Sequence, residues 1–204
     1  INKNVKVDLP IVGDIKSVLT STLKTLKKSK KNFSISNKHQ ISNWWEKIQK
    51  WRSKRSLDYI GSEETIKPQY AIERLYELTK DRDAYITTEV GQHQMWAAQH
   101  YKFNKPNRWM TSGGLGTMGY GLPAAVGVQI AHPKKLVVDI AGEASVLMTM
   151  QEMSTAVQYN LPIKIFILNN EYMGMVRQWQ ELLHDKNYSE SYTAALPDFV
   201  KMAE

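Results

Sequence analysis

Two short apolar runs that end in polar turns constrain the fold of this 204-residue chain more than any other feature. Residues 136–140 form a β-branched run that ends at the turn 141–145, and residues 162–168 form a second run that ends at 169–174. Between them, apolar residues recur at helical spacing over 146–157. This order predicts a strand, a crossover helix and a parallel strand. We therefore expect an α/β fold, a parallel sheet with helices on both faces and a ligand at its carboxyl edge.

The right-handed crossover of such a unit brings both turns to one edge of the sheet, so Glu143 and Asn170 are predicted neighbours. Carboxylate and amide oxygens are the ligands that Mg²⁺ prefers. Gly142, Ala144 and Ser145 are small, so backbone N–H groups there can approach a phosphate, and Ser145 is expected to open a helix whose N-terminus favours an anion. The simpler interpretation, in which Ser145 is only an N-cap and the asparagines only a turn, stays open for each feature alone.

Further segments extend this pattern. Residues 90–96 read Val-Gly-Gln-His-Gln-Met-Trp, residues 112–119 read Ser-Gly-Gly-Leu-Gly-Thr-Met-Gly, and residues 173–179 read Met-Gly-Met-Val-Arg-Gln-Trp. Together with Gly-Glu-Ala-Ser at 142–145 and the asparagine pair at 169–170, they resemble the catalytic chains of the acetolactate (acetohydroxyacid) synthase family of thiamine diphosphate enzymes. The resemblance implies a transferase that decarboxylates pyruvate and condenses it with a second 2-ketoacid, in the first common step of valine, leucine and isoleucine biosynthesis.

The resemblance also implies roles for individual residues. Met118 corresponds to the apolar wedge beneath the bent cofactor, and Trp179 overlooks the substrate entrance. Mg²⁺ is expected on Glu143, Asn170 and the backbone carbonyl of Tyr172. The residues expected to contact thiamine diphosphate are Val90, Gly91, Gln92, His93, Gly116, Met118, Gly142, Glu143, Ala144, Ser145, Asn170, Gly174 and Met175.

The metal motif departs from the general Asp-Gly pattern of thiamine diphosphate enzymes, because Glu143 and Ala144 stand there. Glutamate keeps the charge but adds a methylene, so we expect the backbone to retreat by ~1.5 Å. The glutamate that polarises the cofactor pyrimidine in this family lies on an N-terminal domain of a partner subunit. Since the chain begins at Ile1 and ends within a helix start after Pro197, we expect a fragment that is inactive alone.

Three regions follow from the order of patterns along the chain. Residues 1–31 are expected to be the end of a middle, flavin-binding domain, where Asp14 either lies near FAD or is a helix N-cap. Residues 32–67 are expected to be a basic helical linker whose stripe of apolar and tryptophan residues docks on the domain body. Residues 68–204 are expected to be the thiamine diphosphate-binding domain, incomplete at its C-terminus, with a helix from Pro68 and a strand over 84–88.

Charge and composition narrow the alternatives. Residues 1–55 hold 14 Lys/Arg and 3 Asp/Glu, a net +11, which leaves −4 of the total +7 for the remaining residues. Lysine-rich helix faces are usually solvated, so we expect no nucleic-acid partner. The absence of cysteine excludes disulfides and thiolate metal sites. No apolar run reaches the ~20 residues of a membrane span, and no signal-peptide pattern opens the chain, so we expect no membrane partner and a cytoplasmic, bacterial location.

Other functions remain open at this stage. Residues 114–119 show GxGxxG spacing and Asp139 lies 20 positions further at a strand end, which imitates an NAD fingerprint, but 108–112 is a poor preceding strand. A non-catalytic flavin- or NAD-binding module is therefore one alternative. Pyruvate oxidase, glyoxylate carboligase and 2-ketoacid decarboxylase are alternatives with the same cofactor. For the synthase itself, the resemblance implies pyruvate and 2-ketobutyrate as substrates, a homodimer or tetramer, and a possible small regulatory subunit.

Overall fold

The chain divides into two units, residues 1–56 and 57–204, in a computed structural model that describes residues 3–29 and 38–204. The second unit begins ten residues before the expected boundary near Lys67. Its first segment packs on the rest of that unit, because the Tyr59 hydroxyl donates to Glu73 Oε2 at 2.7 Å and the Tyr59 ring meets the His100 ring edge-on. The segment before Pro68 is thus attached to the second unit by specific contacts.

The first unit contains two helices, α1 (Ile15–Lys28) and α2 (Lys38–Arg52). Asp14 caps α1, since its carboxylate accepts the Ser17 N–H at 2.9 Å, which confirms the N-cap interpretation. Both helices were predicted, and the tryptophan stripe lies on α2 as expected. Residues 3–14 form bends without a strand. Residues 30–37, which include the start of the predicted linker (32–67), lie outside the described residues.

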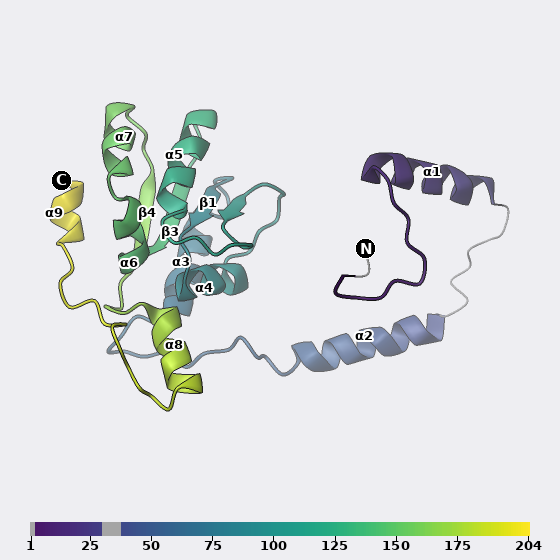
Figure 1. Cartoon of the computed structure of the whole chain (residues 1–204), viewed down its shortest axis with the longest axis horizontal. Coiled ribbons are helices and arrows are strands. Elements are labelled where there is room, and N and C mark those ends of the chain that lie inside the picture. Colours follow the sequence, from purple (N-terminus) through teal and green to yellow (C-terminus); the bar gives the residue numbers. More distant parts are fainter. Residues whose placement is uncertain (1–2, 30–37) are drawn as a thin grey trace. The chain divides into compact units, whose positions relative to one another are not determined.

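The second unit is built around four parallel strands in the order β2-β1-β3-β4 (Figure 1). Gly142 at the end of β3 lies opposite Leu168 at the end of β4, so the turns after these strands share one edge. The predicted α/β class is confirmed. The elements are α3 (Pro68–Thr79), β1 (Tyr85–Thr88), α4 (Gln92–His100), β2 (Trp109–Thr111), α5 (Gly121–Ala131), β3 (Val137–Gly142), α6 (Glu143–Val146), η1 (Leu147–Thr149), α7 (Glu152–Gln158), β4 (Lys164–Leu168), α8 (Gly174–Leu183) and α9 (Phe199–Ala203).

Helices cover both faces of this sheet. On one face, Ile86, Val138 and Ile140 pack against Ile72 of α3 and Ala97 of α4. On the other face, the alternate strand residues Tyr85, Val137 and Ala141 pack against α5 and α6. Figure 1 shows α5 and α7 beside each other on this second face. Because β3 is buried along its whole length, its sequence reads as a continuous apolar run except at Asp139.

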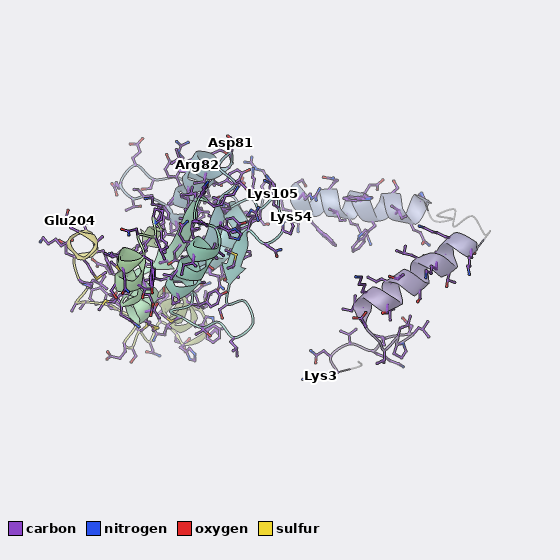
Figure 2. All side chains as sticks on the ribbon, turned by 90° about the horizontal axis from the view of Figure 1, so that it is seen from above. Lys3, Lys54, Asp81, Arg82, Lys105 and Glu204 are labelled. Carbon is purple, nitrogen blue, oxygen red and sulfur yellow. The ribbon has the colours of Figure 1, made fainter. Side chains whose placement is uncertain are left out.

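The amino-terminal edge of the sheet carries an ion-pair cluster. Asp83, just before β1, bonds to Lys105 at 2.9 Å, to Arg108 just before β2 at 3.0 Å, and to Lys135 just before β3 at 2.7 Å. These cations hold the pKa of the Asp83 carboxyl far below its usual range. Figure 2 shows Lys105, together with Asp81 and Arg82, at the surface of the unit. Asp83 therefore links the loops that precede β1, β2 and β3, at the edge of the sheet opposite the polar turns.

The predicted crossover helix over 146–157 is interrupted. It begins at Glu143, passes through the 3₁₀ turn η1, and resumes as α7. Ser145 does not open or cap it as predicted: its hydroxyl donates to the Gly142 carbonyl at 3.0 Å from inside the first turn. The tighter turn lets the Thr149 hydroxyl donate to the Gly119 carbonyl at 3.1 Å. The interruption of the helix therefore coincides with a contact to a distant loop.

The GxGxxG segment at 114–119 and Asp139 do not have the arrangement of an NAD-binding fingerprint. The preceding strand β2 has only three residues and is separated from Gly114 by Ser112 and Gly113, and α5 begins at Gly121, after the last glycine of the pattern. Asp139 is the third residue of β3 rather than its end, and its carboxylate is fully buried and accepts from the Thr87 hydroxyl at 2.9 Å. Because Asp139 is inaccessible to a ribose, the NAD interpretation is wrong. Within the described ranges, no helix has the length and apolar character that a membrane span requires.

Candidate cofactor site

A cleft at the carboxyl edge of the sheet gathers residues from the turn after β1, the loop before α5, the turn after β3 and the turn after β4. Most of the predicted site residues line it: Val90, Gly91, Gln92, His93, Met118, Gly142, Glu143, Ala144, Ser145, Asn170, Tyr172, Gly174 and Met175. Residues that the sequence analysis did not assign also line it: Trp96, Leu168, Met173 and Val176. Trp96 lies three positions after His93 on α4, so helical spacing could have identified it.

Glu143 and Asn170 meet in this cleft, as predicted. The Glu143 side chain is 1% exposed, and burial raises the pKa of its carboxyl. Backbone N–H groups of Asn170 and Tyr172 and the Thr193 hydroxyl act against that rise. Yet Glu143 Oε1 has no hydrogen-bond donor in the part of the chain that the structure describes. A buried carboxylate oxygen that lacks a donor is suited to a cation, so the residues present fit a hard metal ion.

The loop after β4 is held in a defined conformation around Asn170. Asn170 Oδ1 accepts the Tyr172 N–H at 3.2 Å, which confirms the turn interpretation for Asn170. A later segment pairs with the loop, since the Met173 N–H donates to the Ser191 carbonyl at 2.8 Å and the Thr193 N–H donates to the Glu171 carbonyl at 2.9 Å. The sequence analysis missed this support, which brings Thr193 next to Glu143.

His93 lies between two backbone turns of the cleft. A Cβ at Gly142 would lie 2.8 Å from His93 Nδ1, so only glycine allows the end of β3 to approach the ring. Burial lowers the pKa of His93 to about 4, which keeps the imidazole neutral at pH 7. Its Nε2 has no partner within the described ranges. A neutral imidazole donates from one nitrogen only, so His93 would bind an anionic group such as a diphosphate in the tautomer that carries the proton on Nε2.

Three predicted site residues lie elsewhere. Trp179 is 59% exposed and lines a neighbouring hollow with Met175 and Val176, two residues that the hollow shares with the cleft. Gly116 is exposed on the loop before α5, with a left-handed φ of 70°, and does not line the cleft. Asp14 belongs to the first unit and caps α1 there. The cleft therefore contains the predicted metal and diphosphate residues but not every predicted contact.

Helices α4 and α8 lie next to each other in Figure 1, and the first residue of each lines the cleft. Gln92, the first residue of α4, donates from Nε2 to Gln178 Oε1 of α8 at 2.9 Å. The helix starts that carry His93 and Met175 are thus linked to each other.

A parallel sheet with a buried carboxylate, an asparagine turn and a glycine-lined cleft at its carboxyl edge defines a thiamine diphosphate-binding domain. Residues 89–204, more than half of the chain, match the family of the thiamine pyrophosphate enzyme, C-terminal TPP binding domain. The chain belongs to this family.

Relatives specify the resemblance further. The chain is 50% identical over 204 residues to the acetolactate synthase isozyme 3 large subunit of Escherichia coli (strain K12), covering 100% of this chain and 35% of that protein. It is 46% identical over 204 residues to the acetolactate synthase large subunit of Haemophilus influenzae, with the same coverage. It is 47% identical over 210 residues to the mitochondrial acetolactate synthase catalytic subunit of Saccharomyces cerevisiae, covering 29% of it. The chain thus spans about a third of the length of these relatives.

Proposed function

We propose that this chain is the thiamine diphosphate- and Mg²⁺-binding part of an acetolactate synthase catalytic chain. The observation that carries the proposal is the buried Glu143 carboxylate, whose Oε1 has no donor within the described residues and which faces Asn170 at the carboxyl edge of the sheet. The relatives named above are all acetolactate synthases, which favours this reaction over pyruvate oxidase, glyoxylate carboligase or 2-ketoacid decarboxylase.

The residues divide into a metal group and a diphosphate group. Glu143, Asn170 and the Tyr172 carbonyl would hold Mg²⁺, which is expected to complete its octahedron with phosphate oxygens and water. Neutral His93 and Gln92 would contact the diphosphate, together with N–H groups of the small residues at the end of β3. The remaining proposed cofactor contacts in the cleft are Val90, Gly91, Gly174 and Met175, and Gly116 is proposed only through the position of its loop.

Catalysis would depend on how the cleft supports the bound cofactor. Thiamine diphosphate supplies a carbon nucleophile and an electron sink for decarboxylation of a 2-ketoacid. Met118 would provide an apolar surface beneath the rings, and Trp179 would border the entrance for pyruvate and 2-ketobutyrate. The apolar side chains Trp96, Leu168 and Val176 would exclude water from the reacting end of the cleft.

Other features of the synthase stay predictions. These are FAD near Asp14, a homodimer or tetramer, a small regulatory subunit and a cytoplasmic location. The pyrimidine-activating glutamate is expected on another domain, so we also propose that residues 1–204 alone form no acetolactate from pyruvate.

A hybrid enzyme tests the proposal. In the Escherichia coli relative, the segment that aligns with residues 1–204 is replaced by this chain, and acetolactate formation from pyruvate is measured with and without Mg²⁺ and thiamine diphosphate. We expect activity that requires both, with the unaltered relative as the control. A hybrid that melts like its parent but neither binds the cofactor nor forms acetolactate would contradict the proposal. Acetate or acetaldehyde as the main product would favour the alternative reactions.

A further inference from the structure

Glu89 is a buried carboxylate that lies just before the cofactor cleft and is not among its lining residues. It directly follows β1, is fully buried, and donates its backbone N–H to the Ile140 carbonyl of β3 at 3.0 Å. Its backbone is therefore part of the sheet. The next residue, Val90, lines the cleft.

The Glu89 side chain reaches the loop before α5. Its Oε2 accepts the Gly119 N–H at 2.6 Å, and its Oε1 accepts the Leu122 N–H at 3.1 Å. Both oxygens of one carboxylate thus hold the point where the loop becomes α5, and a negative charge at a helix N-terminus is favourable. Met118 immediately precedes Gly119 and lines the cleft.

The rest of this loop has little support of its own. Leu115 is 94% exposed, and the N–H groups of Gly116 and Thr117 bond back to Ser112 within the loop. Its start is tied down by Gln94, which donates to Thr111 Oγ1 at 2.6 Å. Its end is tied down by Glu89 and by the Thr149 hydroxyl. The position of Met118 relative to the carboxyl ends of the strands therefore depends on the hydrogen bonds that Glu89 and Thr149 make with Gly119.

We propose that Glu89 is a positioning residue that fixes Met118 relative to Val90 and Gly91 and so sets the separation between two walls of the cofactor cleft. The inference rests on the proposed function, because thiamine diphosphate is the ligand that these walls would hold. It adds a residue that touches neither metal nor cofactor but determines where an apolar contact to the cofactor stands.

A second buried carboxyl group, Asp139, lies next to Glu89. Burial and the adjacent Glu89 raise the pKa of Asp139 to about 7, so Asp139 holds a proton through much of the range below neutrality. Burial also raises the pKa of Glu89, but the backbone N–H groups of Gly119–Leu122 oppose that rise. Of the two carboxyl groups, Glu89 alone accepts backbone N–H bonds from the loop, and Asp139 accepts from Thr87.

Hydrogen exchange of the purified chain without cofactor tests the first step. Glu89→Ala removes both acceptors and Glu89→Gln removes one, and the second variant serves if the first does not fold. We expect amides in 113–122 to exchange about tenfold faster or more, as for loss of a hydrogen bond to a charged group. Asp83→Asn is the matched control, because it makes the same carboxyl-to-amide change at the amino-terminal edge of the sheet, away from the loop. Unchanged exchange in 113–122, or an equal increase throughout the unit, would overturn the inference.

The hybrid enzyme tests the second step. In Glu89→Gln we expect the Michaelis constant for thiamine diphosphate to rise about tenfold or more, with a smaller change in kcat at saturating cofactor. A loosened loop with an unchanged Michaelis constant would overturn the positioning role while leaving the proposed function intact. Failure of the unsubstituted hybrid to bind the cofactor would overturn the proposed function and this role together, so the two failures are distinguishable.

Discussion

Gly174 at the start of α8 lies so close to Gln92 at the start of α4 that a Cβ at position 174 would overlap the Gln92 side-chain oxygen. The Gln92 side chain is held in this place by its hydrogen bond to Gln178, one turn into α8. Two helices that are 82 positions apart at their starts therefore meet without space for a methyl group. Their contact sets one side of the cofactor cleft.

Gly174→Ala is expected to weaken cofactor binding more than folding. The added methyl group would displace Gln92 and break its hydrogen bond to Gln178, at a cost of about 0.5–1.5 kcal/mol in stability. Gly127→Ala is the matched control, because a Cβ there meets no atom within 4 Å and should stabilise α5 by about 0.5–1 kcal/mol. Titration of the hybrid enzyme with thiamine diphosphate and thermal melting measure both effects. Equal cofactor affinity in the two variants would show that the contact does not shape the cleft.

Glu143→Ala should abolish Mg²⁺-dependent cofactor binding. It removes the buried carboxylate that faces Asn170, so the diphosphate would lose a metal ligand and its charge. Since removal of groups that only support metal ligands costs about 10–100-fold in affinity, we expect a larger loss here. Glu143→Asp keeps the charge and should retain part of the affinity. Calorimetry at saturating Mg²⁺ is the measurement, and equal affinities of Glu143→Ala and its parent would remove Glu143 from the metal site.

Trp179→Leu should change substrate preference with little effect on folding. Its side chain is 59% exposed beside Met175, so its truncation leaves no core cavity. Ile86→Ala, at a fully buried position, is the contrasting control and should cost about 2–5 kcal/mol. The hybrid enzyme is supplied with pyruvate and 2-ketobutyrate together, and the ratio of the two products is compared. A large drop in the melting temperature of Trp179→Leu with an unchanged product ratio would assign Trp179 a structural role.

Asp139 should make stability depend on pH between its ordinary and its raised pKa. Burial raises this pKa from 3.8 to about 7, so the folded state binds a proton that the unfolded state releases in this range. Its contribution is therefore fully present below about pH 4 and is lost as the pH rises towards 7, by a few kcal/mol at most. Asp139→Asn keeps the shape without the titration. Urea unfolding from pH 4.5 to 7.5 should show that the difference in stability, variant minus parent, grows with pH; a constant difference would contradict the assignment.

The α/β class, the sheet edge that carries the polar turns and the meeting of Glu143 with Asn170 could all be predicted from local pattern. Two apolar runs of strand length that are joined by a helix indicate neighbouring parallel strands in a buried sheet. The right-handed crossover then places the turns after both strands at one edge of the sheet. Glu143 and Asn170 follow the ends of β3 and β4 closely, so predicting where the two strands end also predicted where these side chains lie.

The tertiary structure alone decided the form of the crossover and the support of the cleft. The helix after Glu143 is interrupted where Thr149 reaches Gly119, and no local preference encodes a contact between residues 30 positions apart. Likewise Glu89 reads in the sequence as an ordinary residue after a strand, and Thr193 as part of a polar loop. Each gains its place from a hydrogen-bond partner that is distant along the chain, since buried polar groups must be paired whatever the local propensity.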